Sequence, residues 1–238
     1  MTNDALLHET WRRWELLADA PATFPAPGRA TVVVSPNSGF CPPGWVGLVT
    51  LGGAVLATAP DERRARLLRA ALHEQPDEPA TDPDLLRTLL PVTGLLGPAA
   101  LAYLAPGGLR PHPATVHQLP CDDARLCDLA HRTGAADAEE SGLAGLTSPV
   151  FTVLAEDGRV LAACGYRRWP FGIAHLGVLT DPAHRGHGLA RRAASAAARH
   201  ALAAGLLPQW RARVPASRRV AARLGFRELG TQLSVEVG

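Results

Sequence analysis

Ten residues, Asp181-Pro182-Ala183-His184-Arg185-Gly186-His187-Gly188-Leu189-Ala190, form the part of the sequence best suited to chemistry. They lie between an apolar, strand-like segment (173–180) and an Ala-rich, helix-like segment (188–204). Glycines let a backbone approach a ligand closely. A helix start adds unpaired N–H groups and the positive end of the helix dipole. With Arg185 alongside, the stretch predicts a phosphate-binding loop.

Two common phosphate motifs are excluded by the residues themselves. A nucleotide P-loop needs Gly-Lys-Ser/Thr, but the chain has no lysine, so its 24 basic residues are all arginine. A dinucleotide fingerprint needs a third small residue in GxGxxG, where this sequence has Arg191. What remains is Arg-x-x-Gly-x-Ala after a strand, with Pro182 in the turn.

This pattern resembles the coenzyme A pyrophosphate loop of the GNAT N-acetyltransferase superfamily. A second motif, Ser217-Arg218-Arg219-Val220-Ala221-Ala222-Arg223-Leu224-Gly225-Phe226, resembles that family's last helix and its Leu-Gly-Phe entry to the next strand. The spacing leaves room for one helix and one strand, as that fold demands. The resemblance covers roughly residues 110–238 and is closest to arginine-rich bacterial members. It implies an α/β (α+β) fold, with a mixed central sheet flanked by helices.

The resemblance also implies a cofactor, acetyl-CoA, and the residues that hold it. In this family the strand before the loop splays from its neighbour and the pantetheine arm enters the gap. Carried over, the arm is lined by Val178, Leu179 and Thr180. Ser217 helps to hold the cofactor. The pyrophosphate is wrapped by Arg185, Gly186, His187, Gly188, Leu189 and Ala190. No residues with metal-ligand spacing stand out, so we expect no metal.

An amine acceptor must lose a proton before it attacks a thioester, because a free ammonium has a pKa of roughly 10. His175 is the first candidate for the base, and Glu140 and Glu139 come next. Tyr166 and Trp169 are expected either to wall the acceptor pocket or to lie in the core. The backbone N–H of Val178 is a candidate for stabilising the oxyanion.

One position departs from the family pattern. Relatives often carry a tyrosine in the last helix that protonates the leaving thiolate, and here that position is Ala221. Two functions therefore stay open. The first is an acetyl-CoA-dependent N-acetyltransferase that acts on a small-molecule or protein amine by direct attack in a ternary complex. The alternative is a non-catalytic acyl-CoA-binding sensor or partner-binding protein on a degenerate scaffold.

The elements that must position these residues follow from periodicity and turn residues. We expect a domain boundary in the Gly- and Pro-rich run 107–113, which separates a smaller N-terminal α/β region (1–108) from an acetyltransferase domain (109–238). The first region is either a degenerate copy of the same fold or a lid. Helices are predicted at 5–18, 61–73, 82–90, 122–132, 136–146, 188–204 and 216–224, and strands at 31–34, 45–50, 54–58, 115–119, 150–154, 160–166, 173–180, 208–213, 226–229 and 232–237.

Composition and charge indicate where the protein is located and which partners it can have. Hydrophobic residues make up 47% and charged residues 19% of the 238 residues, and the net charge is +2. No apolar run reaches the roughly 20 residues of a membrane span, and the N-terminus lacks a signal pattern. We therefore expect a cytoplasmic protein, a monomer or homodimer, with no membrane partner. The ten arginines of residues 181–230 suit a phosphate-rich cofactor better than nucleic acid, because no aromatic platform accompanies them.

Overall fold

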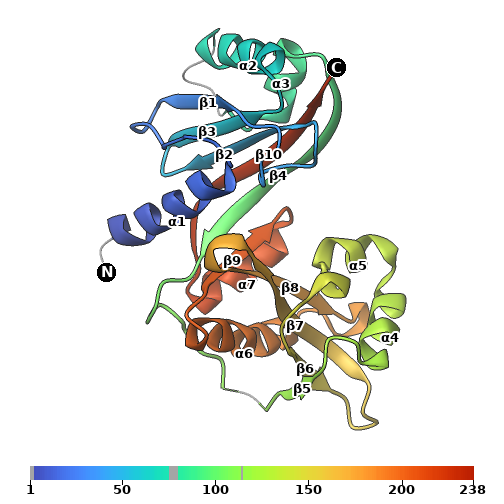
Figure 1. Cartoon of the computed structure of the whole chain (residues 1–238). Helices are drawn as coiled ribbons and strands as arrows, with labels where there is room; N and C mark the ends of the chain where they lie inside the picture. The colour runs from blue at the N-terminus through green and yellow to red at the C-terminus, as the bar shows by residue number, and fades with distance from the viewer. Residues whose placement is uncertain (1–2, 75–79, 114) are drawn as a thin grey trace. The chain divides into compact units, whose positions relative to one another are not determined.

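The computed structural model describes residues 3–74, 80–113 and 115–238. In it the chain divides into two units. The first unit comprises Met1–Leu101 and Glu228–Gly238, and the second comprises Ala102–Arg227. The C-terminal strand thus returns to the N-terminal part of the chain (Figure 1).

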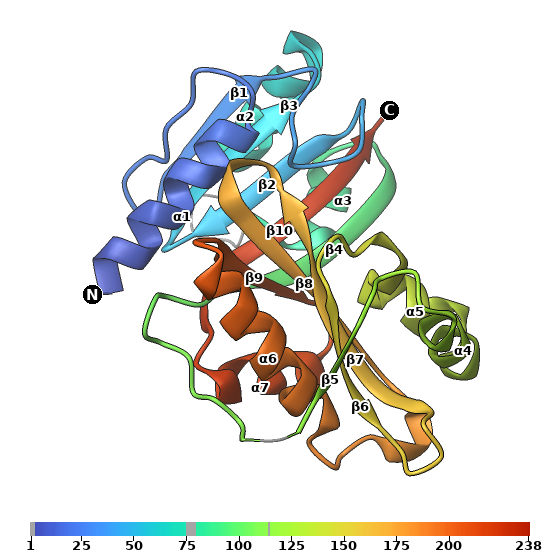
Figure 2. The ribbon, with the colours of Figure 1, turned by 60° about the horizontal axis from the view of Figure 1, so that its bottom comes forward.

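The first unit is a sheet with helices on both faces. Its strand order is β1-β3-β2-β10-β4. Helices α2 and α3 pack on one face through the core around Leu68, Leu86 and Leu233, while α1 lies on the other face (Figure 2). The elements are α1 (Asn3–Leu17), β1 (Ala30–Val34), β2 (Val46–Leu51), β3 (Ala54–Ala59), α2 (Glu62–Glu74), α3 (Pro83–Leu89), β4 (Val92–Tyr103) and β10 (Arg227–Val237).

Local sequence explains most of these boundaries. The carboxylate of Asp61 accepts the Arg64 N–H at 2.8 Å at the start of α2, and Asp82 caps α3 in the same way. Gly52 and Gly53 both have positive φ, as the tight β2–β3 hairpin requires. The predicted helices, first strand and hairpin of this region are confirmed.

The second unit contains the predicted phosphate loop. Its strand order is β5-β6-β7-β8-β9, and the pairs are antiparallel except for the parallel pair of β8 and β9. The sheet is therefore mixed, as predicted. The elements are β5 (His117–Leu119), α4 (Ala124–Thr133), α5 (Ala135–Ser141), η1 (Leu143–Gly145), β6 (Val150–Leu154), β7 (Val160–Trp169), η2 (Pro170–Gly172), β8 (Ile173–Thr180), η3 (Pro182–His184), α6 (Leu189–Ala203), β9 (Leu207–Ala212) and α7 (Pro215–Leu224).

Helices cover both faces of this second sheet. Figures 1 and 2 show α6 and α7 on one face and α4 and α5 on the other. The alanines of α6 pack closely against Tyr166, Leu176 and Trp210, because small side chains let the helix approach the strands. On the opposite face, Leu126 and Leu129 of α4 pack on a core that includes Leu179.

Two predictions about organisation were wrong. Strand β4 was not predicted, because Gly94, Gly97 and Pro98 interrupt its apolar pattern. The two strands expected at 226–229 and 232–237 are one continuous strand, β10, which pairs with β2 through Gly230 and Thr231. Gly230 does not turn the chain. It lets the backbone pass close to the carbonyl of Thr50, where a Cβ would clash.

The unit boundary also differs from the one expected at residues 108 and 109. The chain divides after Leu101, and residues from Glu228 onward belong to the first unit. The Gly- and Pro-rich run 107–113 is not a linker. Its backbone is anchored in the second unit, because Arg110 N–H donates to the Leu224 carbonyl at 2.9 Å and His112 N–H donates to Ser195 Oγ at 3.0 Å.

Among residues 3–74, 80–113 and 115–238, no helix has the length and apolar character needed to cross a membrane.

Candidate active site

The central feature of the site is the separation of β8 from β9. The two strands pair in parallel only over Ile173–Leu207, Ala174–Pro208 and His175–Gln209. Strand β8 continues to Thr180 and β9 to Ala212, so both run on beyond the last pair. The sheet therefore opens from residue 176 of β8 onward, in the direction of the phosphate loop.

The backbone of β8 presents polar groups to this opening. In an antiparallel pair, successive residues direct their N–H and C=O groups alternately toward and away from the partner strand. Asp181 N–H donates to the Leu161 carbonyl of the β7 side at 2.9 Å. By alternation from Asp181, the backbone groups of Leu176, Val178 and Thr180 face the β9 side, where pairing has ended.

The loop after β8 has the conformation of a ligand cradle. Gly186 and Gly188 have φ values of 84° and 76°, in the left-handed region that favours glycine. A Cβ built on either would meet nothing within 4 Å, so the cradle is open on that side. Gly188 is the N-cap of α6 and supplies no side chain, which leaves the first-turn N–H groups without a side-chain cap.

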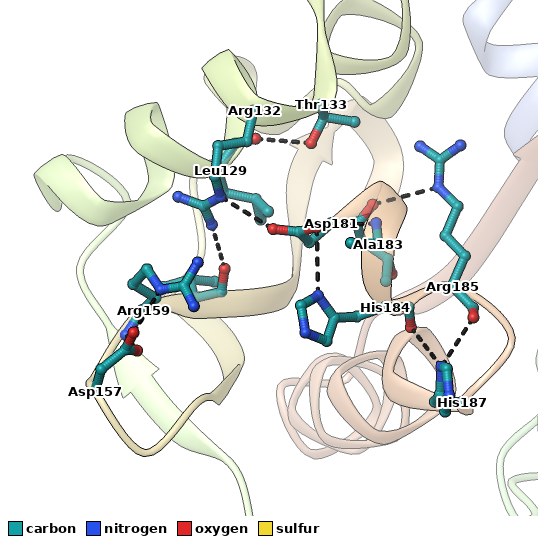
Figure 3. A network of polar contacts seen from close by, with 12 residues as sticks. Leu129, Arg132, Thr133, Asp157, Arg159, Asp181, Ala183, His184, Arg185 and His187 are labelled. Atoms are coloured by element: carbon teal, nitrogen blue, oxygen red, sulfur yellow. Dashed lines mark hydrogen bonds and ion pairs between the residues drawn. The ribbon is translucent and has the colours of Figure 1, made fainter.

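A buried carboxylate holds the loop in this shape (Figure 3). Asp181 accepts hydrogen bonds from Arg132 Nε and Ala183 N–H, both at 3.0 Å, and lies 3.4 Å from His184 Nδ1. Burial raises the pKa of Asp181, but these three donors together hold it below its ordinary value. Arg132 also donates to the Val160 carbonyl at 2.6 Å, so α4 ties the loop to β7.

Two loop side chains are already engaged. Arg185 Nη2 lies 2.6 Å from Asp137 Oδ2 of α5, and its Nε donates to the Thr180 carbonyl at 3.4 Å. The ring of His187 folds back on the loop, where Nδ1 donates to the Arg185 carbonyl at 2.9 Å (Figure 3). Arg185 is half exposed at this position, so its guanidinium can change partners without crossing a packed core.

These residues fit a coenzyme A pyrophosphate. The open glycine cradle, the uncapped start of α6 and Arg185 all favour a negative charge at one place. Within the described residues, the Nε atoms of Arg191 and Arg192 in the first turn of α6 are buried without a hydrogen-bond partner. An anionic ligand at this helix start could offer these Nε–H groups a hydrogen-bond acceptor.

The other residues predicted to bind the cofactor differ in which of their groups are free to meet it. Val178 packs against the α6 face and Leu179 is buried on the α4 face, so the β8 backbone between them is what faces the opening. Leu189 is buried with its side chain in the core, which leaves its backbone for a ligand. Ser217 Oγ accepts the indole N–H of Trp210 at 2.9 Å, and its own hydroxyl proton is available to donate.

His175 stands where β8 and β9 part. Its Nδ1 lies 2.9 Å from Gln209 Oε1, which can only accept, so Nδ1 carries the proton and Nε2 presents a lone pair. Gln209 is fully buried and donates from Nε2 to Tyr103 Oη at 2.8 Å. Burial, together with the positive charge of Arg211 and Arg167, lowers the pKa of His175 to about 4, although the bond to Gln209 opposes this.

The surroundings of the two glutamates differ from those of His175. Glu140, at the end of α5, is ion-paired with Arg213, and both of its carboxylate oxygens are used. Glu139 is exposed on the same helix. Neither has a distinctive environment of the kind that surrounds His175.

The aromatic residues have different roles. Tyr166 is fully buried beneath α6 and lies 2.9 Å from His200 Nδ1, so it belongs to the core. Trp169 is half-buried and stacks on His175 with ring centroids 4.7 Å apart. Ala221, the departure from the family pattern noted in the sequence, is buried in the core.

Three residues that shape the site were not predicted from the sequence. Gln209 and Tyr103 orient His175, and Asp137 pairs with Arg185. A glutamine within the otherwise apolar segment 206–210 was a visible signal for Gln209. Asp137 gave none, because an acid on an exposed helix is ordinary until the loop that it meets is known.

Among the described residues, no group of three or more His, Cys, Asp or Glu side chains could hold a metal ion. Four thiols are free, and Cys121 and Cys127 are exposed. Cys164 is buried, and burial raises the pKa of its thiol well above the ordinary range.

Residues 151–231, from β6 into β10, match the family model described as GNAT acetyltransferase. No curated protein matches. Similar solved structures include a GNAT-family acetyltransferase from Novosphingobium aromaticivorans, which is 19% identical over 60% of this chain and 65% of that chain with a TM-score of 0.48. The chain thus spans just under two thirds of that protein's length.

Two further structures are similar. A GNAT-family acetyltransferase from Colwellia psychrerythraea is 14% identical over 81% of each chain, with a TM-score of 0.49. A GNAT superfamily phosphinothricin acetyltransferase from Sinorhizobium meliloti, solved in complex with acetyl-CoA, is 17% identical over 52% of this chain and 88% of that chain, with a TM-score of 0.40.

The mixed sheet, the parting of β8 from β9 and the loop at the start of α6 are the features expected of an acyl-CoA-dependent acyltransferase fold. The part of the chain that holds them, residues 151–231, matches the GNAT acetyltransferase family model. The family predicted from the two motifs is confirmed for this part of the chain.

Proposed function

We propose that the protein is an acetyl-CoA-dependent N-acetyltransferase that transfers the acetyl group directly to a primary amine. The observation that carries the proposal is the opening between β8 and β9, which is lined by backbone groups of β8 and ends at the glycine cradle. An extended, amide-containing arm suits such a strand edge, and a pyrophosphate suits the cradle.

The chain's own residues supply binding and proton transfer. In this proposal Val178 and Thr180 offer backbone groups to the arm, and the Val178 N–H stabilises negative charge on the thioester oxygen, which the direction of the β8 backbone groups supports. His175 accepts the amine proton at Nε2, either directly or through water. Gln209 acts as a positioning residue, because its bond to Nδ1 selects the tautomer that leaves Nε2 free.

The reaction balances without a further reagent. The amine nitrogen forms a bond to the acyl carbon as the carbon–sulfur bond breaks, and the amine proton passes to His175. The thiolate takes a proton from water, since Ala221 offers no acid and a thiol pKa of about 8.5 makes a dedicated acid dispensable. The glutamates stay second candidates for the base.

The test separates an enzyme from a non-catalytic binder. Calorimetry with coenzyme A measures binding, and thiol release from acetyl-CoA is followed with a panel of amines. We expect binding together with amine-dependent thiol release, and a loss of about a hundredfold in kcat in His175→Ala. Binding without any amine-dependent release would support the alternative, an acyl-CoA sensor.

A further inference from the structure

One row of side chains crosses the second sheet beside the opening. In the antiparallel β7–β8 pair, Arg167 stands opposite His175, and in the parallel β8–β9 pair His175 stands opposite Gln209. Because alternate side chains of a strand share a face, Trp169 lies on the same face as Arg167, and Arg211 on the same face as Gln209. All five residues belong to the second unit.

This row lies on the α5 side of the sheet, just beyond the end of that helix. Gly177, the next residue of β8 on the same face, lies directly beneath the Ser141 carbonyl at the end of α5. At His175 the helix has ended, and the ring is covered by Trp169 instead. An acceptor that reaches the parting of β8 and β9 from this side therefore meets Arg167, Trp169 and Arg211 around His175.

The charge of the row is positive. Arg167 and Arg211 both act on His175 through their charge. The guanidinium of Arg167 is exposed and forms no hydrogen bond or ion pair with the described residues. Glu140, an acid at the end of α5, is paired with Arg213 and does not offset this charge. A simple cationic amine would be repelled here.

Resting on the proposed acetyltransferase function, we infer that the acceptor is an amine that itself carries an anionic group, a carboxylate or a phosphate, close to the amine. The anionic group forms a charge-assisted hydrogen bond with Arg167, whose planar guanidinium matches both oxyanions. The same positive charge favours the neutral form of the bound amine, which is the nucleophilic form.

The test uses matched pairs of amines in the acetyl-CoA thiol-release assay with the full-length protein. One pair is L-alanine and L-alaninamide, and the other is O-phosphoethanolamine and ethanolamine, with spermidine as a cationic amine. The amine of L-alaninamide is less basic than that of L-alanine, so a larger fraction of it is unprotonated at neutral pH. In the absence of recognition by the protein, L-alaninamide should therefore react faster. We expect the anionic member of at least one pair to have a kcat/KM about tenfold higher or more, and the pair that shows this identifies carboxylate or phosphate.

The variant Arg167→Gln tests whether Arg167 binds the anionic group of the acceptor, and Arg168→Gln is its matched control. The two arginines are neighbours in β7 with the same charge and exposure, but they point to opposite faces of the sheet. Arg167→Gln should raise KM for the anionic amine about tenfold and leave the neutral amine unchanged, while Arg168→Gln changes neither. Melting temperatures of both variants equal to that of the wild type show that folding is intact.

The outcomes separate the two proposals. If spermidine or the neutral amines react as well as the anionic ones, or if Arg167→Gln keeps the preference, the inference is overturned and the acetyltransferase stands. If coenzyme A binds and no amine of the panel releases thiol, the proposed function fails and takes the inference with it.

Discussion

The guanidinium of Arg185 lies 2.6 Å from the carboxylate of Asp137, so the cation of the phosphate loop already has a partner on α5. A pyrophosphate that binds the loop must compete with this carboxylate or add to it. The relationship makes Asp137 an internal competitor for the ligand and gives it a measurable effect on affinity.

Asp137→Asn should tighten coenzyme A binding about two- to fivefold, the range set by exposed ion pairs. Arg185→Gln should weaken binding about tenfold, because a charge-assisted contact is lost. Calorimetry at fixed ionic strength measures both. Asp128→Asn on α4, also exposed, is the control for a general change in charge. Equal affinities in Asp137→Asn and Asp128→Asn would show that Asp137 does not compete.

Gly188→Ala tests the cradle. At a φ of 76° an alanine costs about 1 kcal/mol of stability, and its methyl group projects into the open space of the cradle. Gly158→Ala, in the turn between β6 and β7, is the control. Gly158 also has a positive φ, 82°, and a Cβ there likewise meets nothing within 4 Å. Urea unfolding should show similar losses for both.

Only Gly188→Ala should also weaken coenzyme A, by about tenfold or more, because its methyl group blocks the approach of the phosphate to the backbone. If the two glycine variants bind coenzyme A equally well, the cradle is not where the pyrophosphate lies.

His175 makes stability depend on pH. Its pKa in the folded state is lowered to about 4, below the ordinary 6.5, so the unfolded chain binds this proton more readily. The stability linked to His175 is thus fully present above pH 6.5 and is lost as the pH falls toward 4. The loss amounts to at most about 3 kcal/mol.

Urea unfolding of the wild type and of His175→Gln at pH 7 and pH 5 measures this difference. Glutamine keeps a polar side chain of similar length without a titrating group, so the variant should lose less stability between the two pH values. Parallel pH dependence in the two proteins would mean that His175 is not held neutral by its surroundings.

Gly177→Ala should destabilise the second unit by about 1–3 kcal/mol, the usual range for overpacking. A Cβ at this position would run into the backbone carbonyl of Ser141, which cannot rotate away. Gly145→Ala, in η1, is the control, because a Cβ there meets nothing within 4 Å. Thermal unfolding compares the two, and equal melting temperatures would contradict the close approach of α5 to β8.

Residues 173–190 could be predicted because their signals are local. An apolar run ends at Asp181-Pro182, glycines follow at 186 and 188, and small residues then begin a helix, so strand, turn and helix can be read within about 20 residues. The structure places β8, the loop and α6 there. The roles assigned to the individual residues stay predictions.

The contacts across strands could not be predicted, since they depend on register and strand order. That His175 meets Gln209, and Gln209 meets Tyr103, follows only once the β8–β9 pairing is known. The same limit applies to β10, whose apparent break at Gly230 is a close approach to β2. A glycine read alone does not distinguish a turn from a contact.

The parting of β8 from β9 has one more consequence. It creates, inside the sheet, the kind of unpaired edge that proteins usually keep at the rim or cover. The backbone groups that would receive the cofactor arm can equally pair with a stray extended segment from another chain. Bound coenzyme A would cover this edge. Protein purified without coenzyme A is therefore expected to self-associate more readily than protein kept saturated with it.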